Sequence, residues 1–157
     1  MQIYLVQHGE AKPEEIDPQR RLTESGARAV QNVADFLRTS GGLKVDAIWH
    51  SGKPRAQQTE ELLRPATRAA EGAVMHHDGL ASKDAVEPIK RELAQQNSNV
   101  MIVGHLPFLG RLAALLLTGN ADKEVVAFQF GCVVSLKRDD SGRWKLEWMM
   151  VPELLGG

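Results

Sequence analysis

Short apolar runs alternate with longer amphipathic stretches along most of this chain, and this rhythm restricts the fold more than any other feature. Strands are predicted at residues 2–6, 45–51, 73–77 and 99–105. Helices are predicted between and after them, from Thr23 to Gly41 and over 54–64, 84–96 and 107–117. Such alternation predicts an α/β fold with three layers, α/β/α, in which helices cover both faces of a mostly parallel central sheet.

The last part of the chain has a different pattern. EVVAFQF (124–130), VVSLKR (133–138) and WKLEWMMV (144–151) all look like strands, and DDSG between the last two is typical of a hairpin turn. We therefore expect an antiparallel C-terminal edge to the sheet. Simple alternation would place Trp144 and Trp148 on one face of the last strand.

Length and composition narrow the class of protein. The 157 residues suit one domain spanning 1–157, and a formal net charge of -1 provides no basic surface for nucleic acid. The longest apolar stretch, LAALLL (112–117), is far shorter than the roughly 20 residues of a membrane span. A single cysteine, Cys132, cannot form an internal disulfide and is expected in the core, and no signal peptide is recognisable. The expected location is the cytoplasm.

Polar residues stand where three predicted strands end. His8-Gly9 follows the first strand, and Ser51 to Arg55 follow the second. Gly104-His105 ends the strand at 99–105. Ligands of parallel α/β sheets bind at the carboxyl ends of strands, so these residues are expected to converge. An arginine fork and two helix N-termini, near residues 54 and 107, favour an anion such as phosphate.

Other catalytic signatures are missing from the sequence. It contains no Walker-type glycine-rich loop, no GxSxG elbow and no CxxC pair. A neutral histidine can attack phosphorus and carry the phosphoryl group covalently, so histidine is the plausible nucleophile.

Four segments in order resemble the histidine phosphatase superfamily, the phosphoglycerate mutase-like proteins, and within it the short SixA-type phosphohistidine phosphatases. VQHGEA (6–11) is similar to the family's RHG-x-A, and LTESG (22–26) to L-T-x-x-G. SGKPRAQQTEELL (51–63) resembles S-x-x-x-R-A-x-Q-T, and VGHLP (103–107) resembles V-G-H-x-P. The resemblance extends over nearly the whole chain.

This resemblance implies a reaction and a site. His8 would be phosphorylated in the reaction, while Arg55 and His105 would bind and polarise the phosphoryl oxygens. Gln7, Gly9 and Ser51 would complete the phosphate-binding pocket. The family uses no metal or other cofactor. The implied activity is removal of a phosphoryl group from phosphohistidine, and the implied partner is a phosphorylated protein or a small phosphorylated substrate.

Gln7 departs from the family pattern, because an arginine usually precedes the nucleophilic histidine. Hydrogen bonds that involve a charged group are worth about 1.5–3 kcal/mol, against about 1 kcal/mol for a neutral pair. Lys12, Arg20 or Arg21, in the loop after the first strand, could supply the missing charge. A non-catalytic module that binds phosphate or a phosphoprotein is therefore an alternative.

A third hypothesis is a phosphomonoesterase for small molecules, which needs an acid to protonate its leaving alkoxide. Asp78 and Asp84 are the nearest candidates, and neither matches a family acid position convincingly. This favours a phosphoramidate substrate such as phosphohistidine.

Other polar residues are expected to be structural. Adjacent side chains of a strand point to opposite faces, so His76 and His77 cannot readily bind one metal ion. His50 is expected to be buried against a helix, and Gln58 and Thr59 are expected to stabilise their helix locally.

Overall fold

A mixed β-sheet forms the centre of the computed structural model, which describes residues 1–70 and 72–156. Over these residues the sheet has six strands in the order β3-β2-β4-β1-β5-β6. Their bounds are β1 Gln2–Gln7, β2 Ala47–His50, β3 Val74–His76, β4 Val100–Gly104, β5 Val133–Arg138 and β6 Trp144–Met150. The first four strands are parallel to their neighbours among β1, β2, β3 and β4. β5 pairs antiparallel with β1, and β6 pairs antiparallel with β5. The predicted sheet, including its antiparallel C-terminal edge, is confirmed.

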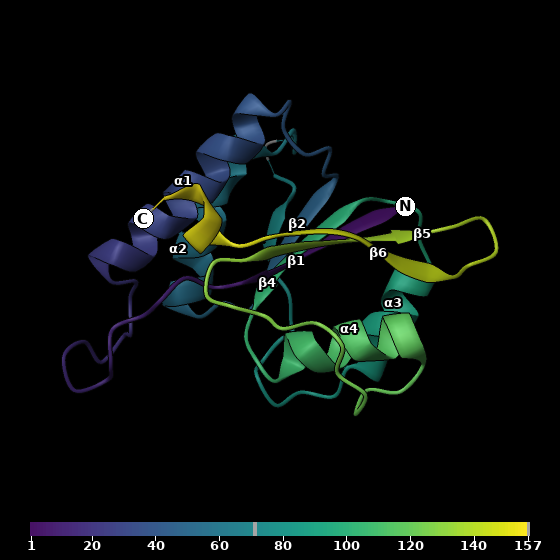
Figure 1. Ribbon diagram of the computed structural model, residues 1–157. Helices are drawn as coiled ribbons and strands as arrows, with labels where there is room; N and C mark the ends of the chain where they lie inside the picture. The colour runs from purple at the N-terminus through teal and green to yellow at the C-terminus, as the bar shows by residue number, and fades with distance from the viewer. Residues whose placement is uncertain (71, 157) are drawn as a thin grey trace.

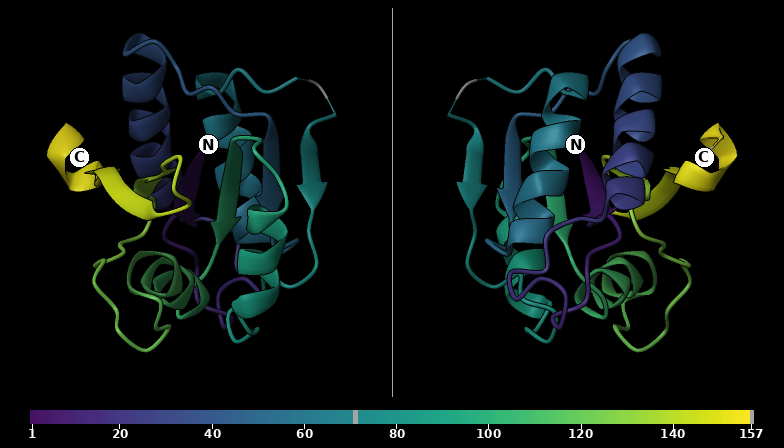
Figure 2. Two further views of the ribbon diagram at one scale, coloured as in Figure 1. Left: turned by 90° about the vertical axis from the view of Figure 1, so that its right-hand side faces the viewer. Right: turned by 90° about the vertical axis from the view of Figure 1, so that its left-hand side faces the viewer.

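Helices cover both faces of this sheet (Figures 1 and 2). Their bounds are α1 Glu24–Thr39, α2 Pro54–Leu63, α3 Glu87–Ala94 and α4 Phe108–Thr118, with short 3-10 helices η1 Arg64–Ala66 and η2 Pro152–Leu155. α1 and α2 pack on one face, and α3 and α4 on the other. The three-layer prediction is therefore confirmed. Among the described residues, no helix is long and apolar enough to cross a membrane.

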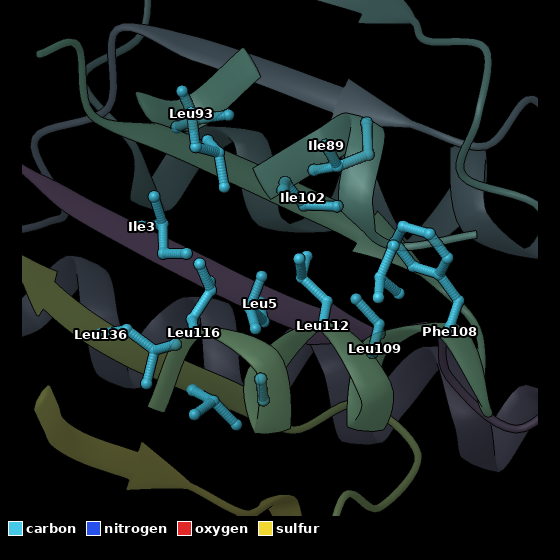
Figure 3. Packing of buried hydrophobic residues seen from close by; sticks show 14 of the residues in the cluster. Ile3, Leu5, Ile89, Leu93, Ile102, Phe108, Leu109, Leu112, Leu116 and Leu136 are labelled. Atoms are coloured by element: carbon cyan, nitrogen blue, oxygen red, sulfur yellow. The ribbon is translucent and has the colours of Figure 1, made fainter. Parts of the chain in front are cut away.

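The core consists of two clusters separated by the sheet. Ile3 and Leu5 of β1 face α3 and α4, while Tyr4 and Val6 face α1 and α2. Figure 3 shows the first cluster, in which α4 side chains such as Leu112 lie over β1 and β4. Because β1 is buried on both faces, the strand end that precedes His8 is firmly held.

Local signals explain where α1 begins and ends. The Thr23 hydroxyl oxygen accepts a hydrogen bond of 2.9 Å from the Gly26 N–H and caps the first turn. After the helix, Gly41 and Gly42 adopt positive φ angles of 104° and 76°, a conformation that favours glycine. Both the cap and the stop were predicted.

The strand predicted at 124–130 is wrong, because this segment is an irregular loop between α4 and β5. β1 already pairs with β4 on one side and β5 on the other, and no free strand edge remains beside it. Val126 and Phe128 instead pack against the core cluster below the sheet. The apolar alternation of this segment therefore indicates side chains that pack against the core, and the segment does not pair as a strand.

The prediction that Trp144 and Trp148 share a face is also wrong. The register of β5 and β6 shifts between Ser135 and Leu136, so that Trp148 lies opposite Ser135 and Leu146 opposite Leu136. Because of this irregularity, the side chains of β6 before and after the shift do not follow one simple alternation between the two faces of the sheet. Trp144 joins the cluster with α3 and α4, and Trp148 packs against the cluster with α1 and α2.

The helix predicted over 84–96 is shorter than expected and spans Glu87–Ala94. Pro88 lies in its first turn, where the missing N–H group costs no internal hydrogen bond. The proline therefore marks the start of α3.

Candidate active site

His8 directly follows β1 and is held by backbone contacts on two sides. Its N–H donates to the Gly104 carbonyl at the end of β4, with an N–O distance of 3.0 Å. Its own carbonyl accepts from the Gly131 N–H at 3.2 Å. The position of His8 is thus determined by β4 and by the loop before β5.

The His8 side chain is buried and has a defined proton position. Its Nδ1 lies 2.6 Å from the Gly9 carbonyl oxygen. Because a carbonyl can only accept, Nδ1 carries the proton and Nε2 keeps its lone pair. This is the tautomer in which Nε2 can act as a nucleophile.

His105, which follows β4, lies beside His8 with 5.0 Å between the ring centroids. Its Nε2 is 2.6 Å from the Ser51 hydroxyl oxygen at the end of β2. The ends of β1, β2 and β4 therefore meet, and the predicted convergence of His8, His105 and Ser51 is observed.

Arg55 lies in the first turn of α2, close enough for its positive charge to lower the pKa values of both His8 and His105. Its Nε is buried and has no hydrogen-bond partner within the described part of the chain. No side chain caps the N-terminus of α2 at Lys53. A guanidinium group and an uncapped helix start therefore stand beside the histidine pair, which suits an anion.

Burial keeps both histidines neutral at physiological pH. It lowers the pKa of His8 to about 4, and the charges of Arg55 and Arg20 contribute, although the bond to Gly9 acts in the opposite direction. Burial is also the main cause that lowers the pKa of His105 to about 3. Neutral imidazole is the form that attacks phosphorus.

Gln7, the departure from the family pattern, is buried at the end of β1. Its backbone pairs with Gly104 of β4, and its carbonyl accepts from the Gly131 N–H at 2.9 Å. Its Oε1 has no hydrogen-bond partner among the described residues. A neutral amide therefore occupies the position next to the histidine pair.

Arg20 brings a second positive charge to the histidine pair from the loop after β1. This charge lowers the pKa values of His8, His105 and Arg55. Arg20 Nε donates to the Lys12 carbonyl at 3.1 Å, and Arg20 has a φ of 49°, which is uncommon for a residue other than glycine. Arg21 instead forms a 2.9 Å ion pair with Asp17.

Thr59 of α2 supports the site in a way that the sequence analysis missed. Its hydroxyl donates to the Arg55 carbonyl at 2.8 Å, which is the expected local helix contact. The same oxygen accepts from the Gly9 N–H at 2.9 Å, and Thr59 is fully buried. Thr59 thus connects Arg55 with Gly9, whose carbonyl orients the His8 ring.

Tight packing explains the glycines of the first two motifs. A Cβ on Gly9 would lie 3.0 Å from Val30 Cγ2 and 3.2 Å from the Gly26 carbonyl oxygen. A Cβ on Gly26 would lie 2.3 Å from the Glu10 carbonyl oxygen. The loop after His8 therefore passes so close to α1 that a side chain at Gly26 would displace backbone, and one at Gly9 would require its neighbours to shift by a few tenths of an ångström.

Thr59→Val is expected to lower the free energy of unfolding by about 1–3 kcal/mol, because the buried Gly9 N–H loses its acceptor. Urea denaturation measures this loss. Thr118→Val is a matched control, since Thr118 also donates to the carbonyl four residues earlier and accepts from a backbone N–H. Thr118 is exposed, so water replaces its bonds, and equal losses in the two variants would contradict the role of Thr59.

The other polar residues considered in the sequence have structural contacts of their own. His50 is buried as expected, and its ring stacks at 5.9 Å on His76 of β3, not on a helix residue. His77 packs on Trp49 and lies 2.6 Å from Glu92 through its Nε2. Asp84 accepts from the Ala81 N–H, whereas Asp78 is exposed.

The chain is similar to proteins of known identity, although no protein-family model matches it. It is 25% identical to phosphohistidine phosphatase SixA of Escherichia coli K12 over 97% of this chain and 94% of SixA. The structure of the protein histidine phosphatase SixA complexed with tungstate superposes with a TM-score of 0.84, 24% identity and 99% coverage of both chains. Phosphoglycerate mutase from Bacillus anthracis matches with a TM-score of 0.70, 12% identity and coverage of 99% and 95%. In sequence and in structure, the chain is therefore a homologue of the phosphohistidine phosphatase SixA, with the phosphoglycerate mutase-like fold of the histidine phosphatases.

Proposed function

We propose that the protein is a phosphatase that removes a phosphoryl group from phosphohistidine, carried by a protein, through a phosphorylated His8. The observation that carries this proposal is the 2.6 Å contact of His8 Nδ1 with the Gly9 carbonyl, which leaves Nε2 unprotonated. The similarity to SixA supports the same reaction.

The reaction proceeds in two displacements at phosphorus. In the first, the Nε2 lone pair of His8 forms a P–N bond while the P–N bond of the substrate breaks. The leaving imidazole keeps that electron pair and departs neutral when its other nitrogen carries a proton. In the second, water attacks phosphorus, the bond to Nε2 breaks with its electron pair returning to His8, and the proton of water passes to solvent.

The residues around His8 have distinct roles in this proposal. Arg55 and His105 bind the phosphoryl oxygens, and Ser51 orients His105 through the 2.6 Å contact. Gln7 completes the phosphate pocket beside the uncapped start of α2, and Gly9 contributes by leaving space and by orienting His8, because its N–H is bonded to Thr59. Tungstate, which the related SixA structure contains, is a tetrahedral oxyanion like phosphate, and this supports an oxyanion site here.

The two candidate acids support a substrate class, because neither is held within the described part of the chain in a way that marks it as an acid catalyst. Asp84 is engaged by the Ala81 N–H, and Asp78 is exposed. An imidazole leaving group needs less protonation than an alkoxide, which favours phosphohistidine over a phosphate ester.

Gln7 keeps a second candidate open, a non-catalytic module that binds phosphate or a phosphoprotein. The amide that stands in the usual place of an arginine weakens any stabilisation of a transition-state charge. Such a module would bind phosphate without turnover.

The direct test is rapid-quench incubation with a protein labelled with ³²P on histidine. We expect release of inorganic phosphate and a transient, acid-labile label that peptide mapping assigns to His8. Calorimetric binding of phosphate without release or label would favour the binding module. Faster release from aryl or sugar phosphates than from phosphoramidates would favour a phosphomonoesterase.

The buried His8 ring is expected to stay neutral until the pH falls to about 4. An unfolded histidine has a pKa near 6.5, so the folded chain binds fewer protons between these values and its stability falls as the pH drops through this window. NMR titration of the imidazole nitrogens measures the His8 value. A midpoint near 6.5 would show that burial does not control its charge.

A further inference from the structure

Phe130, in the loop before β5, lies directly against the proposed nucleophile. Its ring centroid is 5.6 Å from that of His8, and the ring planes are tilted by 42°. This separation is within the range of favourable aromatic pairs. Yet Phe130 is 51% exposed, so part of the residue is free to contact another molecule.

The loop holds Phe130 in this place through backbone bonds. The N–H of the next residue, Gly131, donates both to the Gln7 carbonyl at 2.9 Å and to the His8 carbonyl at 3.2 Å. The Cys132 N–H donates to the Gln129 carbonyl at 3.1 Å and closes a turn around Phe130. Gly131 has a φ of 76°, and a Cβ there would lie 3.2 Å from Pro152 Cγ. The exposed ring is therefore positioned by the same strand end that positions His8.

Phe130 also borders a cavity of about 430 Å³. The cavity lies between the loop after β1, the start of α1 and the 3-10 helix η2, with Gly9, Gly26 and Pro152 among its lining residues. Phe130 therefore has open space beside it, although His8, Arg55 and His105 are not among the lining residues of this cavity.

We propose that Phe130 is a specificity-determining residue that stacks against a planar heteroaromatic leaving group, such as the imidazole of phosphohistidine. This inference rests on the proposed phosphatase function and adds a residue, Phe130, that recognises the leaving group of the substrate. The leaving group is planar and bonded to the phosphorus atom that His8 attacks, which places it within reach of the ring beside His8. Arg55 and His105 recognise the phosphoryl oxygens and cannot distinguish an aromatic leaving group from a small amine.

Two substrates that share a P–N bond test this role. N-phosphoimidazole loses imidazole, whereas phosphoramidate loses ammonia, and phosphate release gives kcat/KM for each. For Phe130→Ala, we expect the ratio of kcat/KM for phosphoimidazole to that for phosphoramidate to fall by about two- to tenfold relative to the unmodified protein, the range of one aromatic pair. Phe130→Tyr should keep the original ratio. Val125→Ala, which removes an exposed apolar side chain from the same loop, should leave both values unchanged.

The comparison separates the possible failures. An unchanged ratio in Phe130→Ala would overturn the inference, and if both kcat/KM values fell equally, Phe130 would only cover His8. Release of phosphate from neither substrate by the unmodified protein would contradict the proposed phosphatase function itself. Circular dichroism establishes that each variant is folded, and the exposure of Phe130 makes its removal compatible with folding.

Discussion

His8→Ala is expected to lower kcat for phosphohistidine by about 10⁴-fold or more, since removal of a catalytic nucleophile leaves only transition-state binding by the remaining groups. The acid-labile phosphoenzyme should disappear at the same time. Phosphate binding should persist, because Arg55, His105 and the start of α2 are still present. Rapid-quench kinetics and calorimetry on the same preparation measure these three effects.

His77→Ala provides a matched control for the loss of one histidine ring. The contacts of His77 are with Trp49 and Glu92, and its removal should change kcat by less than about twofold, the small effect of a residue outside the site. If His8→Ala retained turnover within tenfold of the unmodified protein, a covalent intermediate on His8 would be excluded. The transferred phosphoryl group would then need another acceptor.

Strand ends were the part of the site that the sequence could predict. The motifs place His8, Ser51 and His105 immediately after apolar runs, and parallel pairing brings those run ends to one edge of the sheet. The 5.0 Å approach of the two histidine rings follows from this simple topology. The start of helix α2 was also predictable, because proline, here Pro54, is favoured in the first turn of a helix.

Contacts between segments distant in sequence were not predictable from local pattern. Thr59 looked like a residue that stabilises its own helix, because its bond to the Gly9 N–H depends on how α2 packs against the loop after β1. Phe130 belonged to a segment whose apolar alternation suggested a strand, and only the bonds of Gly131 to β1 place its ring on His8. The register shift in β6 likewise has no local signal in the sequence.

Arg20→Gln is expected to lower kcat/KM for phosphohistidine by about 10²-fold, the effect of losing one preorganised group that stabilises transition-state charge. The sequence offered Lys12, Arg20 and Arg21 as substitutes for the arginine missing at Gln7. The charge of Arg20 acts on His8, His105 and Arg55, whereas that of Lys53 acts only on His105 among these three and Arg21 is paired with Asp17. We therefore propose that Arg20 supplies the second cation of the pocket.

Arg21→Gln is the matched control, because it removes the neighbouring charge and leaves Arg20 in place. Its kcat/KM should stay within about threefold of the unmodified protein, because Arg21 is exposed and is paired with Asp17, which is buried, rather than with the histidine pair. Glutamine is preferable to glycine at position 20, because glycine would also relieve the positive φ and change the loop conformation.

A double replacement distinguishes a relocated charge from a lost one. Gln7→Arg alone should raise kcat/KM by less than about tenfold, because Arg20 already provides a charge to the pocket, but in the Arg20→Gln background the same change should restore at least about tenfold. The opposite pattern, a gain of about 10²-fold from Gln7→Arg with no effect of Arg20→Gln, would mean that the native pocket lacks a cation it needs. Weak turnover and retained phosphate binding would then both follow from Gln7, and the binding module would become the better account of the protein.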